Sequence, residues 1–229
     1  VSSISHVKVF FANVGYFSTF SSSSSHRKAF FMANKIEIPS PGETRWYYRA
    51  RTIDVIFKNY QQLHDILEKV NNDPSGWDDD SISLISGLLG HLDRFLFCFL
   101  LCFFNRIFEQ SSILYAILQG RDTDFNYGMR KVENFKSFLD SIRNDAEFNQ
   151  SYKSAVDKVG PPVSRADQKI NYKQLYFQVI DTIVGMLNER FQDVQSFAFL
   201  ILSTPSCLRT MEEWYHQVRL ISSRKGMDL

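Results

Sequence analysis

Apolar residues recur along most of this chain at spacings of three and four, the period of one face of an α-helix. The first such stripe consists of Ile4, Val7, Phe10, Phe11, Val14 and Phe17. We expect a helix that begins after Ser2 or Ser3 and ends in the serine run 21–25. A serine of that run can cap a short second helix through residues 26–31.

A loop and a long helix are predicted next. The periodic pattern fails between residues 34 and 43, where Pro39, Pro41 and Gly42 punctuate a loop. Thr44 is a suitable N-cap for a helix that carries an apolar stripe as far as Val70. The polar segment 71–76 then ends this helix.

Further helical patterns fill the rest of the chain. Asp78, Asp79 and Asp80 precede a pattern over 82–119, with a bend expected at Gly90. The other predicted helices, the first of them capped by Asp122 or Asp124, cover 129–142, 148–159, 172–202 and 211–220. With almost no strand signal, the sequence predicts an all-α fold. We divide it into N-terminal helices and a loop (1–43), a main helical domain (44–203) and a short C-terminal helix with a tail (204–229).

Composition and charge exclude several classes of protein. The chain has 229 residues, is 44% hydrophobic and contains 21 Phe, so it can bury a core and is not disordered. Its net charge of +1 gives no overall attraction to nucleic acid, so any DNA contact requires a local basic patch.

Cysteine content and apolar runs bear on the compartment. Three cysteines, Cys98, Cys102 and Cys207, encode neither a disulfide framework nor a zinc module, which favours an intracellular, reducing location. The most apolar run, 95–104, is about half the ~20 residues of a membrane span, so we predict a buried core helix and no membrane partner. No secretory signal is readable. The chain begins with Val1 in place of an initiator Met, which suggests a fragment or processed product.

A search for catalytic or metal-binding spacing finds no strong candidate. No phosphate-binding glycine loop or nucleophile motif occurs. His64 and Glu68 lie one helical turn apart, but two ligands without a third are more typical of a solvated pair. Asp181 is read as a salt-bridged surface residue, and Cys98 and Cys102 as core residues. We therefore expect no catalytic residue, no metal site and no cofactor in this chain.

The local basic patch lies where the long helix begins. Arg45, Arg49 and Arg51 surround Trp46 there, and Arg27 and Lys28 are further candidate phosphate ligands. Guanidinium groups bind phosphates and aromatic rings stack on unpaired bases, so this mixture suits nucleic acid with exposed bases. Trp46 also lies on the apolar stripe, so a core role is the alternative.

The same segment opens a resemblance to a known family. The pattern continues over nearly the whole chain in Phe104-Asn105-Arg106-Ile107-Phe108-Glu109-Gln110, Ala116-Ile117-Leu118-Gln119-Gly120-Arg121-Asp122, Tyr172-x-x-x-Tyr176-Phe177 and Leu187-Asn188-Glu189-Arg190-Phe191. In order and spacing these motifs resemble hAT-superfamily transposases, especially the transposon-derived zinc finger MYM-type 1 group and the related repressor of the inhibitor of the protein kinase.

The resemblance implies a fold and a limited function. It implies the helical insertion domain of a ribonuclease H-like transposase, located in the nucleus. The family's two Asp motifs and its Ser-Glu-Arg-x-Phe-Ser motif do not occur in this chain. The chain is thus expected not to be an enzyme by itself, and Mg is expected only in a full-length active relative. Arg45 and Trp46 match the family's Arg-Trp pair, whose Trp helps to stabilise a flipped base at the transposon end.

Two hypotheses follow from these observations. In the first, the chain is a transposon-derived fragment that is catalytically incompetent alone and associates with DNA, such as a transposon end, through the Arg-Trp element. In the second, it is a helical scaffold that binds a protein partner or itself through an exposed apolar face and has no DNA role.

Overall fold

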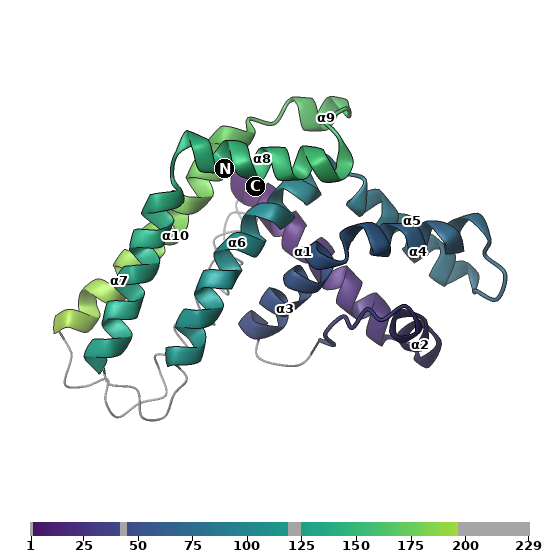
Figure 1. The fold of residues 1–229 in the computed structure, drawn as a ribbon, viewed down its shortest axis with the longest axis horizontal. Helices are drawn as coiled ribbons and strands as arrows, with labels where there is room; N and C mark the ends of the chain where they lie inside the picture. Colours follow the sequence, from purple (N-terminus) through teal and green to yellow (C-terminus); the bar gives the residue numbers. More distant parts are fainter. Residues whose placement is uncertain (1, 42–44, 119–124, 197–229) are drawn as a thin grey trace, which may run out of the picture. The chain divides into compact units, whose positions relative to one another are not determined.

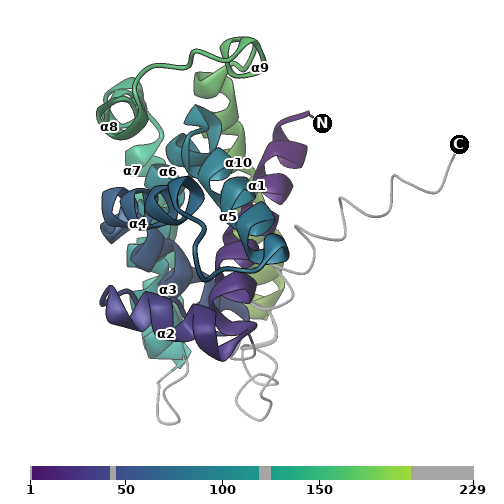
Figure 2. The ribbon, with the colours of Figure 1, turned by 90° about the vertical axis from the view of Figure 1, so that its right-hand side faces the viewer.

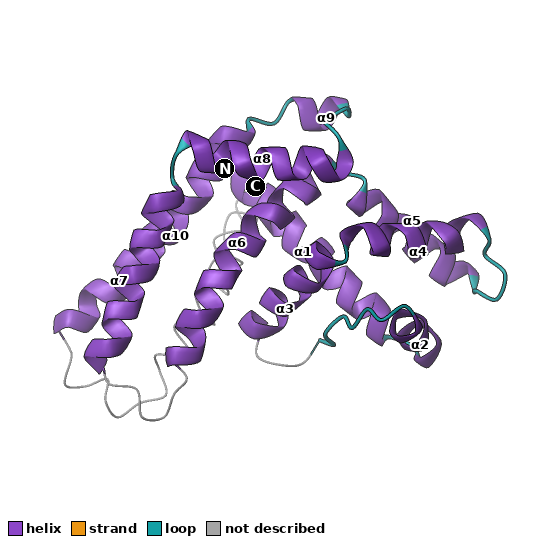
Figure 3. Cartoon of the chain, viewed as in Figure 1, coloured by secondary structure: helices purple, strands orange, loops and turns teal. Residues whose placement is uncertain are grey.

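The chain is all-helical in the part that the structure describes. A computed structural model describes the backbone of residues 2–41, 45–118 and 125–196, and the side chains of 5–41, 48–114 and 127–189. Helices and loops account for these segments and no strand occurs in them (Figures 1 and 3). The all-α prediction is therefore confirmed.

The first two helices lie where their sequence predicts, and α2 extends beyond the predicted range 26–31 at both ends. Helix α1 (Ser2–Ser22) ends in the serine run, and α2 (Ser25–Ala33) turns sharply away from it (Figure 2). The hydroxyl of Ser24 accepts a hydrogen bond from the backbone N–H of Arg27, at 3.1 Å, and so caps α2.

The predicted long helix over 44–70 is wrong in one respect, because it is two helices. These are α3 (Arg45–Lys58) and α4 (Tyr60–Asn72), and Asn59 separates them. The side-chain amide of Asn59 donates to the carbonyl of Val55, at 2.9 Å. The same carbonyl also accepts the backbone N–H of Asn59, at 3.0 Å, while Asn59 itself departs from helical geometry with φ −105° and ψ 22°. Asparagine side chains that bond to nearby backbone groups lower the preference of this residue for a helix interior. The predicted cap Thr44 lies outside the described residues.

The bend predicted at Gly90 is also wrong. Gly90 lies inside α5 (Asp79–Leu92), and the chain breaks at Asp93 and Arg94 before α6 (Phe95–Leu118). Tyr60 donates its hydroxyl hydrogen to the carbonyl of Leu92, the last residue of α5. Helices α4 and α5 pack side by side, so the carbonyl at the end of α5 is satisfied by a residue far away in sequence.

The remaining helices largely follow the predicted pattern. They are α7 (Phe125–Ile142), α8 (Asp145–Val159), the single turn α9 (Arg165–Gln168) and α10 (Tyr172–Ser196). Residues 197–229 lie outside the described part, and with them the end of the helix predicted to Leu202, the helix predicted at 211–220 and Cys207. The divisions predicted at 43/44 and 203/204 also fall outside it and stay predictions.

Two compact units make up the chain. The first contains Val1–Lys8, Arg106–Asn149 and Asn171–Leu229, and the second contains Val9–Asn105 and Gln150–Ile170. In the first unit α7 packs against α10 (Figure 1), and the buried Tyr176 donates its hydroxyl hydrogen to the carbonyl of Ile142, at 2.8 Å.

The second unit has a core of phenylalanine rings. Phe10 of α1 is 2% exposed, and its ring centroid lies 5.2 Å from that of Phe11, 5.3 Å from that of Phe97 and 5.5 Å from that of Phe104. Aromatic pairs at such separations contribute beyond the area they bury. The Phe-rich composition therefore serves a packed core.

Helix α6 supplies the most apolar part of that core. Its segment Phe95–Leu114 is, within the described residues, the single stretch long and apolar enough to cross a membrane, and 72% of its apolar window is buried inside the structure. Every residue from 95 to 105 is buried. This burial agrees with the core helix predicted for 95–104.

Candidate nucleic-acid interface

The predicted Arg-Trp element lies at the start of α3. The helix begins at Arg45, so Arg45 and Trp46 belong to its first turn. Their side chains lie outside the described residues, and the choice between base contact and core packing for Trp46 stays a prediction. The free N–H groups of a first helical turn and the helix dipole attract phosphate, whatever the side chains do.

The next two arginines of α3 differ in exposure. Arg49 is half-buried, and its guanidinium carbon lies 5.6 Å from the centroid of the Phe11 ring. Arg51 is exposed. Arg51 is therefore the more accessible of the two to a phosphate in solution.

Arg27 is held within the fold. Its side chain is 13% exposed, and its Nε and Nη2 donate to the hydroxyl of Ser81 at 3.0 and 2.7 Å. Nη1 donates to Ser23 Oγ at 2.8 Å, and the guanidinium carbon lies 4.7 Å from the Phe20 ring centroid. Arg27 thus ties the start of α2 to the start of α5, a role that the sequence did not indicate.

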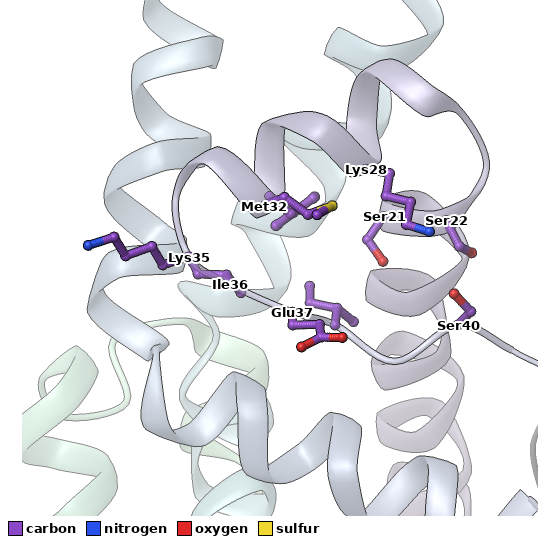
Figure 4. A pocket seen from close by; sticks show the side chains of 10 residues that line it. Ser21, Ser22, Lys28, Met32, Lys35, Ile36, Glu37 and Ser40 are labelled. Carbon is purple, nitrogen blue, oxygen red and sulfur yellow. The ribbon is translucent and has the colours of Figure 1, made fainter.

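Lys28 follows Arg27 on α2 but is exposed. The described residues include no ion-pair partner for its ammonium group. The side chain lines a pocket between the end of α1, helix α2 and the loop after α2 (Figure 4). Of the five basic candidate residues, Lys28 and Arg51 are therefore the two with exposed, described side chains.

The acidic and histidine candidates take part in ordinary surface pairs. His64 Nε2 lies 2.9 Å from Asp93 Oδ1, so its partner comes from the α5–α6 break and not from Glu68. Asp181 accepts two hydrogen bonds from Arg143, at 2.5 and 2.9 Å, as predicted for a salt-bridged residue. Arg143 holds the pKa of the Asp181 carboxyl below its usual value. No group of three potential metal ligands occurs in the segments that the structure describes.

Cys98 and Cys102 are core residues, as predicted. Cys98 is fully buried and Cys102 is 7% exposed, and the hydroxyl of Ser154 lies 3.5 Å from Cys102 Sγ. The hydrogen bond between the two thiols and burial raise the pKa of Cys98. The same thiol contact, assisted by Ser154, lowers the pKa of Cys102. Helix α6 therefore carries two thiols of unequal acidity.

This inequality predicts the order of thiol modification. In a Cys207→Ser background the native protein should react with a disulfide reagent at Cys102 before Cys98, because the thiolate is the reactive form and Cys102 is also the more exposed. Peptide mass spectrometry over a time course measures the order, and the urea-unfolded chain is the control in which the two rates converge. Labelling of Cys98 first would contradict the assignment.

Comparison with known proteins adds no further constraint. The chain matches no protein-family model, and searches of curated proteins and of solved structures give no significant match. The described residues show a helical protein whose basic candidate residues lie on α2 and α3.

Proposed function

We propose that this chain is a transposon-derived, hAT transposase-like helical domain of the nucleus that associates with DNA and does not cleave it. The observation that carries the proposal is the start of α3 at Arg45. It joins the predicted Arg-Trp element to a helix N-terminus, with the exposed Arg51 on the same helix. The all-helical fold is what an insertion domain of such a transposase requires, and it supports the proposal.

In this proposal some of the candidate residues contact DNA and others hold the helices that carry them. Arg45, Arg51 and Lys28 contact phosphates, and Trp46 stacks on a base that has left its pair. Arg49 and Arg27 contribute mainly by holding α3 and α2 in the fold, because both guanidinium groups lie over phenylalanine rings. Binding of this kind depends on salt, since each neutralised phosphate releases counterions.

Strand cleavage is not part of the proposed function. Two-metal phosphoryl transfer requires carboxylates that hold shared metal ions, and the family's carboxylate motifs are missing from this sequence. The pure protein is thus expected to leave DNA intact with Mg or Mn present. Specific nicking by the pure chain would overturn this part of the proposal.

DNA affinity and its salt dependence test the proposal. Fluorescence anisotropy with a labelled hairpin should show binding that weakens as salt rises, and Arg51→Gln should reduce the slope of log affinity against log salt by about 1. Trp46→Ala should weaken binding to a hairpin with an unpaired tip by about tenfold, and binding to a plain duplex by less. The hairpin and duplex arms separate stacking on a base from simple charge attraction.

A matched control removes the same charge elsewhere. Arg130 is an exposed arginine of α7, and Arg130→Gln lowers the net charge as Arg51→Gln does. It should leave the affinity and the salt slope unchanged. Equal effects of the two variants, or binding without salt dependence, would contradict a phosphate contact at α3.

A protein-binding scaffold is the second candidate function. Two apolar side chains of α1, Val9 and Tyr16, are 51% and 55% exposed, and they lie seven residues apart on one face of the helix. Exposed apolar residues that share a face are typical of interaction surfaces. Absence of DNA binding, together with self-association that Tyr16→Ser abolishes, would favour this function over the first.

A further inference from the structure

A pocket of about 420 Å³ lies in the second unit, at the end of α1 and beside α2. Its volume is within the range of about 300–1,000 Å³ found for small-molecule sites. Phe31, Ile36 and Ile38, which are 2%, 1% and 8% exposed, form its apolar wall. The pocket therefore offers buried apolar surface to a ligand.

Polar groups gather at one end of the pocket. Figure 4 shows Lys28, Ser21, Ser22 and Ser40 directed toward one another there, while Met32 and Glu37 lie at the other end and Lys35 points away. A cationic ammonium among hydroxyl groups is suited to an anionic head group, which it can bind by charge-assisted hydrogen bonds.

The serines differ in what they can offer a ligand. Ser21 and Ser22 both donate their hydroxyl hydrogens to the carbonyl of Ser18, at 3.1 and 2.7 Å, so their oxygens present lone pairs. These lone pairs can accept hydrogen bonds from the Lys28 ammonium or from a donor on the ligand. The positive charge of Lys28 is thus the main attraction for an anion.

Glu37 limits the charge of the ligand. Its carboxylate lies in the same pocket, so a second negative charge on the ligand meets repulsion. Because Lys35 points away, Lys28 alone among the charged lining residues offers a positive charge to the ligand, and one cation suits a single negative charge. An apolar body with one carboxylate fits this lining better than a phosphate monoester.

We propose that this pocket is a binding site for a small amphipathic carboxylate, whose apolar body contacts Phe31, Ile36 and Ile38 and whose carboxylate contacts Lys28. The site does not depend on DNA binding, although Lys28 belongs to both proposals. A substitution at Met32 can test the pocket without disturbing DNA binding, because Met32 lines the pocket, is 63% exposed and carries no charge. Met32→Trp therefore fills the pocket and leaves the charge of α2 unchanged.

Titration calorimetry with 2-naphthoate tests the proposal. The protein should bind it saturably at one site, and Lys28→Met should weaken binding by about tenfold or more. The neutral 2-naphthalenemethanol should lose less than about twofold in the same variant, since it makes no charged contact. Lys69→Met, which removes an exposed lysine of α4, is the matched control and should change neither affinity.

Two more variants make the test specific. Met32→Trp should abolish binding of 2-naphthoate while DNA affinity stays as in the parent protein. Glu37→Gln should strengthen binding of 2-naphthyl phosphate relative to 2-naphthoate, whereas Glu68→Gln on α4 should not. The proposal is overturned if 2-naphthoate does not bind saturably, if Lys28→Met and Lys69→Met bind it equally, or if Met32→Trp binds it as the parent does.

Discussion

Replacement of Phe10 by alanine is expected to lower the free energy of unfolding of the second unit by about 3–5 kcal/mol. The ring is 2% exposed and lies within 5.5 Å, centroid to centroid, of Phe11, Phe97 and Phe104. Its removal loses the transfer free energy of the ring and leaves a cavity that the rigid neighbouring rings fill only in part. Total stabilities are about 5–15 kcal/mol, so the loss is a large fraction.

The neighbouring residue supplies a matched control. Val9 precedes Phe10 on α1 but is 51% exposed, so Val9→Ala should change the stability by no more than about 0.5 kcal/mol. Phe10→Leu, which keeps most of the apolar volume, should lie between the two variants and guards against complete unfolding of Phe10→Ala.

Native-state amide hydrogen exchange in α4 and α5 measures this loss within the second unit. Denaturation of the whole chain is less suitable because two compact units need not unfold in one step. Equal exchange rates in Phe10→Ala and Val9→Ala would show that the phenylalanine cluster does not stabilise the unit.

Local periodicity was sufficient for the positions of most helices. The stripe through Phe10 and Val14 predicts α1, and the serine run predicts both its end and the cap of α2, because these signals act within a few residues. Asn59 carried a further local signal, since an asparagine within a helical pattern favours a break. The apolar stripe continues on both sides of Asn59, and the prediction of a single helix over 44–70 rested on that stripe.

Distant contacts were not predictable in this way. At the end of α5 the carbonyl of Leu92 accepts the hydroxyl hydrogen of Tyr60, a residue 32 positions away. The sequence favours Arg27 as a phosphate ligand. In the structure its guanidinium group donates two hydrogen bonds to Ser81, which is 54 residues away. Side-chain partners of this kind become visible only when the helices are packed.

In the first unit, Tyr176→Ala is expected to cost about 3–5 kcal/mol of unfolding free energy. Tyr176 is fully buried, and its ring centroid lies 5.8 Å from that of Phe148 and 5.7 Å from that of Phe177. Its hydroxyl donates to the carbonyl of Ile142, the last residue of α7, at 2.8 Å. One side chain of α10 therefore both fills the unit's core and bonds the end of α7.

Tyr176→Phe separates the hydroxyl from the ring. The carbonyl of Ile142 also accepts the backbone N–H of Asn144, at 3.0 Å, so it is not left unsatisfied when the hydroxyl is removed. The phenylalanine variant should accordingly lose only about 1 kcal/mol. The difference between the two variants then reports the packing of the ring against Phe148 and Phe177.

Amide exchange in α7 and α10 is the measurement, because both helices should lose protection by the same free energy if Tyr176 joins them. Tyr127→Ala is the control: it removes a tyrosine of α7 that is 39% exposed, and it should cost less than about 1 kcal/mol. If Tyr176→Ala reduced protection in α10 and left α7 unchanged, the hydroxyl bond and ring contacts would not couple the two helices. If Tyr176→Ala reduced protection in α4 and α5 as much as in α7 and α10, the two units would unfold together, because the substitution lies in the first unit alone.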